Sequence, residues 1–326
     1  MRSVPSALLI MALAASGVHG QTADWKPEKN VEIMVPITAG SAVDRTARLI
    51  QKILQDRKLI DASSSVVNKP GGGGAIGWTY LNQHAGDGHY VAVATIALLT
   101  NHIIGQSTFS YTDFTALAIL MSEHVTFAVK PDSSLRTGRD LVERLRKDPS
   151  SVSITFAPAI GNQFHIAAAQ VMKSAGGDPR KLKVVVYNGS AEAMTAVLGG
   201  HVDVIVTAAS NVVPQMKAER LRMIAVASPQ RAAGPIAEIP TWKEQGIDAA
   251  IGLWRGVVGP RGLAPAQIAY WDQVFARATR AEEWQKDLEA SLASDIFAAG
   301  REARNFLDAQ YRELKSALSD LGLAKQ

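Results

Sequence analysis

The chain has 326 residues, of which 47% are hydrophobic and 20% charged, with a formal net charge of +4. This composition is typical of a globular protein and excludes a disordered or membrane-spanning chain. The basic excess is small and no Lys/Arg run alternates with aromatic residues, so we expect no nucleic-acid partner. Cysteine is absent, which excludes disulfides, thiolate metal ligands, cysteine nucleophiles and a lipidated cysteine anchor.

The first twenty residues have the pattern of an export signal. Arg2 precedes an apolar segment at residues 4–15, and small residues lead up to Gly20, so we expect a signal peptide at 1–20 and a mature chain from Gln21. The alternative is a short membrane anchor, but the apolar run is too short to span a bilayer. An exported protein without a lipidated cysteine needs an outer membrane to retain it, which predicts a Gram-negative periplasm.

The first half of the mature chain alternates predicted strands, small-residue loops and helices. Strands are predicted at 31–35, from 66 and at 90–95, with a helix from 42 and a short helix through 78 and 81. Fully apolar strands that alternate with helices predict a parallel sheet covered on both faces.

The second half repeats this alternation. Helices are predicted at 141–146, 163–174, 191–198, 265–280 and 301–321, and strands at 151–156, 183–187, 202–206 and 221–227. Two similar α/β halves without a linker predict two lobes joined by strands that cross near 118–129 and 221–228. Lobe 1 would then hold residues 21–121 plus 229–326, and lobe 2 residues 122–228. The length of the chain also fits two domains.

The first predicted loop, Thr38-Ala39-Gly40-Ser41, leads from a strand into a helix. Ser41 followed by Asp44 fits a capping box, and the free backbone N–H groups of such a helix start can bind an anion. The alternative is an ordinary capped turn. For Asp44 two roles remain open: it pins the loop through backbone N–H groups, or it accepts a hydroxyl or ammonium of a ligand.

A second loop occupies the same place in the other half, with Ala159, Gly161 and Asn162 before a helix. Ligands of open α/β sheets bind at the carboxyl ends of the strands, so two such loops facing across a cleft would bind one carboxylate from both sides. The alternative for Asn162 is a simple helix cap, and we expect His165 in the core.

The remaining motifs argue against catalysis and cofactors. Gly72, Gly74 and Gly77 match G-x-G-x-x-G, but no acidic residue follows in the region 95–100 where a dinucleotide site needs one. No G-x-S-x-G or H-E-x-x-H occurs, and the histidines have no metal-ligand spacing, so we expect no enzyme, metal or cofactor. Arg255, after Trp254, would bind a second ligand carboxylate; the alternative is a surface Arg beside a core Trp.

Several short segments together resemble the solute receptors of tripartite tricarboxylate transporters, also called Bug receptors. The resemblance runs from about Val31 to Leu323. Its carriers are Val35-Pro36 with the loop to Asp44, the segment 68–77, Gly86-Asp87-Gly88, the segments 187–190, 199–203, 221–226 and 239–246, and Trp254-Arg255-Gly256. It implies a type II periplasmic-binding-protein fold with two α/β lobes and a ligand cleft between them.

The resemblance also implies a function and a site. A non-catalytic, monomeric periplasmic protein would capture a tricarboxylate, dicarboxylate or related organic acid and deliver it to the membrane permease subunits of the transporter. The implied ligand-binding residues are Thr38, Ala39, Gly40, Ser41, Asp44, Ala159, Gly161 and Asn162, with Thr95, Tyr187 and Asn188 as weaker matches. The alternatives are an exported carboxylate-processing enzyme and a sensory receptor that docks on a membrane kinase.

One departure from the family pattern concerns the first loop. The family usually shows two or three consecutive glycines before its Asp, whereas here Gly40 is followed by Ser41, Ala42 and Val43. The added side chains narrow the space for a ligand and add a hydroxyl. The resemblance therefore predicts a carboxylate and leaves open which one.

Overall fold

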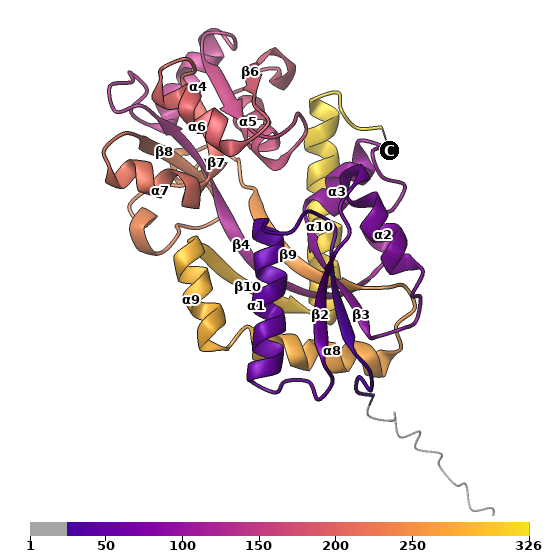
Figure 1. Ribbon diagram of the computed structural model, residues 1–326. Coiled ribbons are helices and arrows are strands. Elements are labelled where there is room, and N and C mark those ends of the chain that lie inside the picture. The colour runs from indigo at the N-terminus through magenta and orange to yellow at the C-terminus, as the bar shows by residue number, and fades with distance from the viewer. Residues whose placement is uncertain (1–24, 326) are drawn as a thin grey trace, which may run out of the picture.

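The computed structural model describes residues 25–325 (Figure 1). The predicted signal peptide and its cleavage after Gly20 lie outside the described residues. Within them the chain forms two lobes that share one 10-stranded sheet.

Lobe 1 is built on three parallel strands in the order β2-β1-β3, extended by antiparallel strands. Its strands are β1 (Val31–Val35), β2 (Ser64–Asn68), β3 (Tyr90–Thr95), β9 (Gly252–Gly259) and β10 (Ala293–Ala299). Its helices are α1 (Ala42–Asp56), α2 (Ala75–Asn82), α3 (Ala97–Ile103), α8 (Pro265–Ala278) and α9 (Glu282–Ser291). The apolar strands need cover on both faces, and helices lie on both, as the sequence predicts.

Lobe 2 repeats this plan with parallel strands β7, β5 and β6. Its strands are β5 (Ser153–Phe156), β6 (Lys183–Val186), β7 (Val204–Ala208) and β8 (Arg222–Ala227), and its helices α4 (Gly138–Lys147), α5 (Gln163–Ser174), α6 (Ser190–Leu198) and α7 (Ala209–Lys217). Five short 3-10 helices lie in the described loops: Gly72–Gly74, Tyr111–Asp113, Pro179–Lys181, Gly234–Ile236 and Lys243–Gln245.

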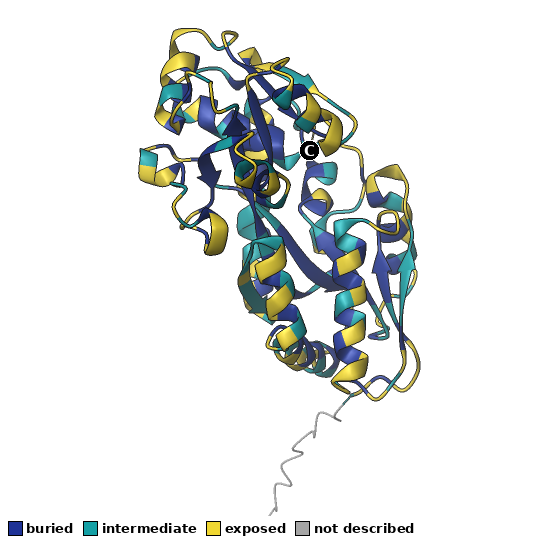
Figure 2. Ribbon diagram, turned by 60° about the vertical axis from the view of Figure 1, so that its left-hand side comes forward, coloured by how far each residue is buried: buried dark blue, intermediate teal, exposed yellow. Residues whose placement is uncertain are grey.

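The long strand β4 (Thr115–Val129) joins the two lobes. Its first part pairs with β9 and β10 of lobe 1, and its last part, from Val125, pairs with β7 and β8 of lobe 2. Figure 2 shows this buried strand running from one lobe into the other. The first predicted crossing, near residues 118–129, coincides with this strand.

The carboxyl ends of the parallel strands in the two lobes point toward each other. Strand β3 ends at Thr95, opposite Arg255, which in turn pairs with Met121 of β4. Strand β7 runs antiparallel to β4 and ends at Ala208, opposite Val125. We call these strand ends, with the loops that follow them, the two facing edges. The fold therefore places the loops after β1 and β5 on facing edges.

The second crossing lies later in the chain than the sequence predicts. Residues 229–251, expected in lobe 1, contact lobe 2. Thr241 bridges Val226, and the Trp242 ring packs at 4.8 Å on Phe127. The chain enters lobe 1 only with β9. This stretch is irregular, so its periodicity gives no sign of where its buried Trp242 packs.

Helix α10 (Gly300–Asp320) packs on both lobes. The Phe306 ring packs edge-on against Trp254 of lobe 1, with the ring centres 5.7 Å apart. The Asp320 carboxylate forms an ion pair with Lys173 Nζ of α5 in lobe 2, at 2.6 Å. The largest hydrophobic cluster accordingly contains residues of both lobes. The two lobes are thus connected by β4, by the return into β9 and by this helix.

Candidate functional site

The first loop is fixed by the start of α1. Ser41 is the N-cap, and its hydroxyl accepts a hydrogen bond from the Asp44 N–H at 3.1 Å, as the capping pattern predicts. The reciprocal bond differs, because the Asp44 carboxylate accepts from Gly40 N–H at 2.9 Å instead of from Ser41. Gly40 has φ +80°, a conformation that side-chain-bearing residues rarely adopt. Thr38 and Ala39 are exposed beside it.

Asp44 is 2% exposed and accepts three hydrogen bonds. Besides Gly40, the donors are Arg48 Nε at 2.9 Å and Asn68 Nδ2 at 3.0 Å. Burial raises the pKa of Asp44, but the hydrogen bonds from Arg48, Gly40 and Asn68 outweigh it and leave the pKa below its usual value. Of its two proposed roles, these contacts favour pinning the loop.

The second loop is fixed by Asn162 at the start of α5. Its Oδ1 accepts from the N–H groups of Phe164 and His165, both at 3.0 Å, and its Nδ2 donates to the Ala157 carbonyl at 2.7 Å. Asn162 is therefore a helix cap, as the alternative interpretation has it, and it holds the loop at the same time. Ala159 is exposed between these bonds.

His165 adds a second restraint on this loop. Its Nδ1 accepts from the Gly161 N–H at 3.0 Å, and its ring stacks on Phe156 at 5.0 Å. The side chain is 5% exposed, as expected for a core histidine, and burial lowers its pKa to about 4. The neutral ring is needed here, because a protonated Nδ1 cannot accept a hydrogen bond.

This histidine predicts a pH dependence of stability. Between pH 6.5, its ordinary pKa, and about 4, the unfolded chain binds a proton that the folded chain does not. The free energy of unfolding should therefore fall as the pH falls through this window, by about 3 kcal/mol in total, and show no contribution from His165 above it. Urea denaturation at pH 7.5 and 4.5 measures this, and His165→Gln should remove that part of the loss. An equal loss in both proteins would contradict the assignment.

Arg255 lies between the two facing edges and is 8% exposed. Its guanidinium is ion-paired with Glu123 of β4 and lies 3.4 Å from the Met121 sulfur. Trp254 points to the opposite face of β9, where it packs on Phe306. The structure matches neither sequence interpretation of Arg255 completely: the residue is buried, and its charge is balanced within the protein.

The weaker candidates also lie at the facing edges. Thr95 ends β3, and its Oγ1 accepts from Ala97 N–H at 3.3 Å. Tyr187 follows β6 and donates its backbone N–H to Phe156, and Asn188 is exposed after it. The topology thus brings the predicted residues of both lobes to one region of the molecule.

Three polar residues that hold predicted site residues in place are absent from the sequence-based predictions. Asn68, Arg48 and Glu123 each bond a predicted site residue, and they are polar groups whose partners are distant in sequence or in the next helical turn. Asn68 is the last residue of β2, within a segment that the resemblance includes. That position at a strand end is the signal that could have identified it.

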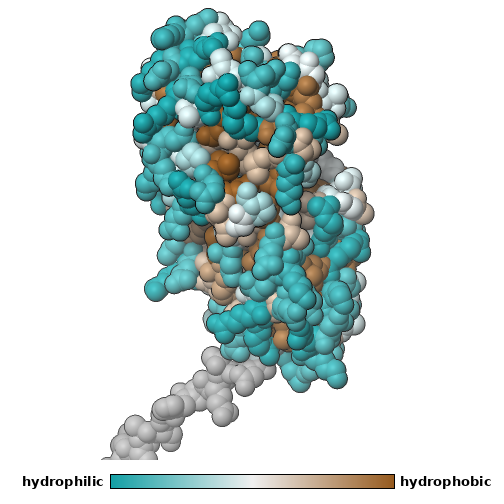
Figure 3. Space-filling model, turned by 90° about the vertical axis from the view of Figure 1, so that its left-hand side faces the viewer, coloured by the Kyte–Doolittle hydropathy of each residue, from teal (hydrophilic) through white to brown (hydrophobic). Residues whose placement is uncertain are grey.

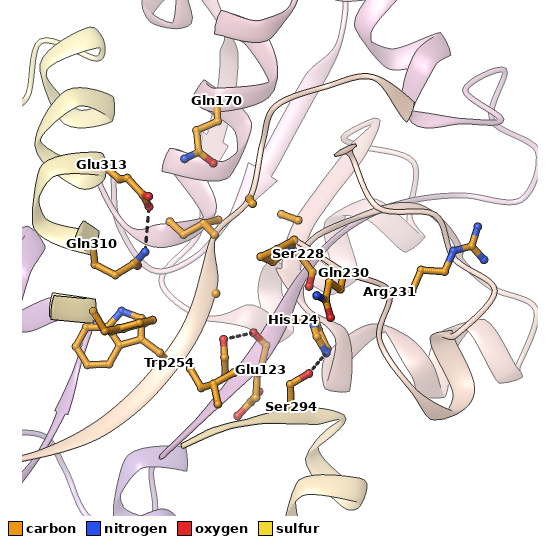
Figure 4. Close-up of a pocket in the computed structure, with 18 of the residues that line it drawn as sticks. Glu123, His124, Gln170, Ser228, Gln230, Arg231, Trp254, Ser294, Gln310 and Glu313 are labelled. Carbon is orange, nitrogen blue, oxygen red and sulfur yellow. Dashed lines mark hydrogen bonds between the residues drawn. The ribbon is translucent and has the colours of Figure 1, made fainter. Parts of the chain in front are cut away.

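A separate cavity of about 740 Å³ lies along the segment that leads into β9 (Figure 4). Trp254 and Gln310 lie on one side of this segment, and His124 and Ser294 on the other. Apart from Glu123, its charged lining residues are Arg231, Asp248, Asp295 and Glu313. The cavity contains none of the predicted ligand residues, and its acidic excess is unsuited to a carboxylate.

The described residues 25–325 contain neither a metal-binding arrangement nor a membrane-spanning helix. No group of three or more His, Asp or Glu in that range is arranged to hold a metal ion. No helix in the same range combines the length and apolarity required to span a membrane.

Comparison with known proteins identifies the family. The model for the tripartite tricarboxylate transporter family receptor matches residues 47–323. The chain belongs to this receptor family. A UPF0065 protein from the tcbD-tcbE intergenic region of a Pseudomonas species is 27% identical to this receptor, over 93% of each chain.

Solved structures support the same fold. A TctC solute-binding protein from Polaromonas has a TM-score of 0.81 and 26% identity to this receptor, over 90% of this chain and 99% of its own. MatC from Rhodopseudomonas palustris, with bound malate, has a TM-score of 0.69 and 20% identity over 90% and 99% of the chains. Another R. palustris protein, with adipate, has a TM-score of 0.74 and 22% identity, over 91% of this chain and 99% of its own. The predicted α/β, type II periplasmic-binding-protein fold is confirmed.

Proposed function

We propose that this receptor captures a small carboxylate between residues 38–44 of lobe 1 and residues 159–162 of lobe 2. The observation that carries the proposal is that two capped helix starts, at Ser41 and Asn162, lie on facing edges. First-turn N–H groups have no intrahelical acceptor, and the helix dipole favours an anion there. Relatives with malate and adipate support a carboxylate as that anion.

The ligand contacts that we propose are therefore those of the sequence analysis. Backbone N–H groups of Thr38, Ala39, Ser41 and Ala159 would bind the carboxylate. Gly40 and Gly161, whose N–H groups donate to Asp44 and His165, would border it and keep the two loops in place. Thr95, Tyr187, Asn188 and Arg255 would border the ligand. The receptor would then deliver it to the permease subunits of a tripartite tricarboxylate transporter, as an exported monomer in the periplasm of a Gram-negative cell.

Two alternatives involve other classes of protein. A carboxylate-processing enzyme would need a reacting group at the facing edges, yet Asp44 and His165 are each engaged in holding a loop. A sensory receptor would use the same site and differ only in its membrane partner. The family's name and its solute-binding relatives favour transport.

Calorimetric titration with malate and adipate tests the proposed site. Ser41→Ala and Asn162→Ala should each weaken binding by about 1–2 kcal/mol, because the loop N–H groups lose their fixed directions. Each should also lower stability by about 1 kcal/mol through the lost cap.

Thr137→Ala is the matched control. Thr137 caps α4, and its hydroxyl accepts from the Asp140 N–H at 3.2 Å. It follows the end of β4 that lies farther from the facing edges. It should lower stability similarly and leave affinity unchanged. Unchanged affinity in both loop variants, or an equal loss in the control, would place the binding site elsewhere.

A further inference from the structure

The exposed apolar side chains have an unusual distribution. In the range 25–325 the large hydrophobic residues that are exposed are Ile37, Ile76, Ile160 and Val186, with exposed fractions between 36% and 55%. All four lie at carboxyl ends of parallel strands or in the segments that follow them. On the face drawn in Figure 3, hydrophobic surface likewise gathers around the level where the lobes meet.

In lobe 1, Ile37 and Ile76 lie at the same edge. Ile37 is two residues beyond β1, and its carbonyl accepts from Asn68 Nδ2 at 3.1 Å. Ile76 lies over Gly71, where an added Cβ would come within 2.6 Å of its Cδ1. Gly74 and Gly77 hold this helix start close against Pro36, the residue before Ile37. Ile37 therefore directly precedes the loop 38–41, and Ile76 belongs to the helix start that packs against Pro36.

In lobe 2, Ile160 and Val186 lie at the opposing edge. Val186 ends β6 and pairs with Phe156, the last residue of β5. Ile160 is presented by the loop that His165 holds through Gly161 and that Asn162 holds through Ala157. Because this loop is restrained on both sides of Ile160, the exposure of the side chain is a fixed feature of the site.

The cations near these edges are mostly engaged. Arg255 is paired with Glu123, and Arg48 with Asp44. Lys69 lies 4.3 Å from the centre of the Tyr80 ring. Arg45 donates to the Gly40 carbonyl at 3.3 Å. A hydroxylated polyacid needs several polar partners along its whole length. Here the polar groups, which are the loop N–H groups with Thr95, Tyr187 and Asn188, lie at the strand ends, and exposed aliphatic carbon lies directly beside the loops.

We propose that the ligand of this receptor is a carboxylate with an apolar carbon body, which contacts Ile37, Ile76 and Ile160. This proposal rests on the proposed function, since the loops must hold the carboxylate end. The apolar body gains from leaving water against these side chains, whereas the hydroxyl groups of malate or citrate would be left without partners there.

Isothermal titration with adipate, hexanoate and benzoate, against malate and citrate, tests the proposal. We expect the best of the first three to bind at least about tenfold more tightly than malate and citrate. Ile37→Ser and Ile160→Ser should each weaken that binding about five- to tenfold, and change malate binding less than about twofold. Ile296→Ser, a partly buried isoleucine in the separate cavity, is the matched control and should change neither.

The outcomes separate this inference from the proposed function. Tighter binding of malate or citrate would overturn the apolar ligand and leave the carboxylate site intact. An equal loss of affinity for all ligands in the two variants would also overturn it. In that case the isoleucines would contact the opposite lobe when the lobes close, and would not contact the ligand. If none of the five acids binds, both proposals fail.

Discussion

Replacing Glu123 with alanine should destabilise the protein by about 3–5 kcal/mol, because it strands the buried guanidinium of Arg255. The Glu123 and Arg255 side chains are only 10% and 9% exposed, so the guanidinium left behind is poorly solvated. The measurement is urea denaturation at neutral pH, with the midpoint and slope compared with those of the wild type. A loss below about 1 kcal/mol would mean that the pair is solvated or that Arg255 finds another partner.

The double variant Glu123→Leu/Arg255→Met is the control for this result. Replacing both charges with apolar groups removes the stranded ion, so the double variant should be more stable than Glu123→Ala. If it is equally unstable, the loss comes from packing between β4 and β9 and the ion pair is not its cause.

Replacing Asp44 with alanine should give the second large effect. The variant loses the acceptor of Gly40, Arg48 and Asn68, so stability should fall by about 2 kcal/mol and ligand affinity by about tenfold or more. Calorimetry with adipate and malate, together with urea denaturation, measures both.

Asp44→Asn is the conservative comparison for this loop. Its amide keeps the size and one acceptor oxygen, so it should keep part of the loop geometry and lose less affinity than alanine does. A ligand that binds equally well to all three proteins would show that the loop needs no anchor at Asp44.

The sequence predicts a helix or strand well where its own residues and the adjacent loops carry the signal. The strand 31–35 and the helix 163–174 have the predicted bounds, because apolar periodicity and small-residue loops mark both. Strand β10 was not predicted. Its residues are half-buried along most of the strand, so the alternation that marks a strand is missing.

The long-range features could not be predicted from local patterns. Glu123 and Arg255 are 132 positions apart, and only the pairing of β4 with β9 brings them together. Trp242 fills the core of lobe 2 from an irregular segment, which is why the second crossing was predicted too early. Ser41 caps its helix as predicted, and Asn162 caps its helix as the alternative interpretation of that residue has it, because capping depends on neighbours within one turn.

The most direct measurement is a crystal structure of the receptor with adipate or hexanoate bound. We predict a carboxylate within hydrogen-bond distance of N–H groups in both loops, 38–41 and 159–162, with the carbon chain against Ile37 and Ile160. A carboxylate in the separate cavity beside Trp254 and Gln310, with both loops empty, would contradict the account.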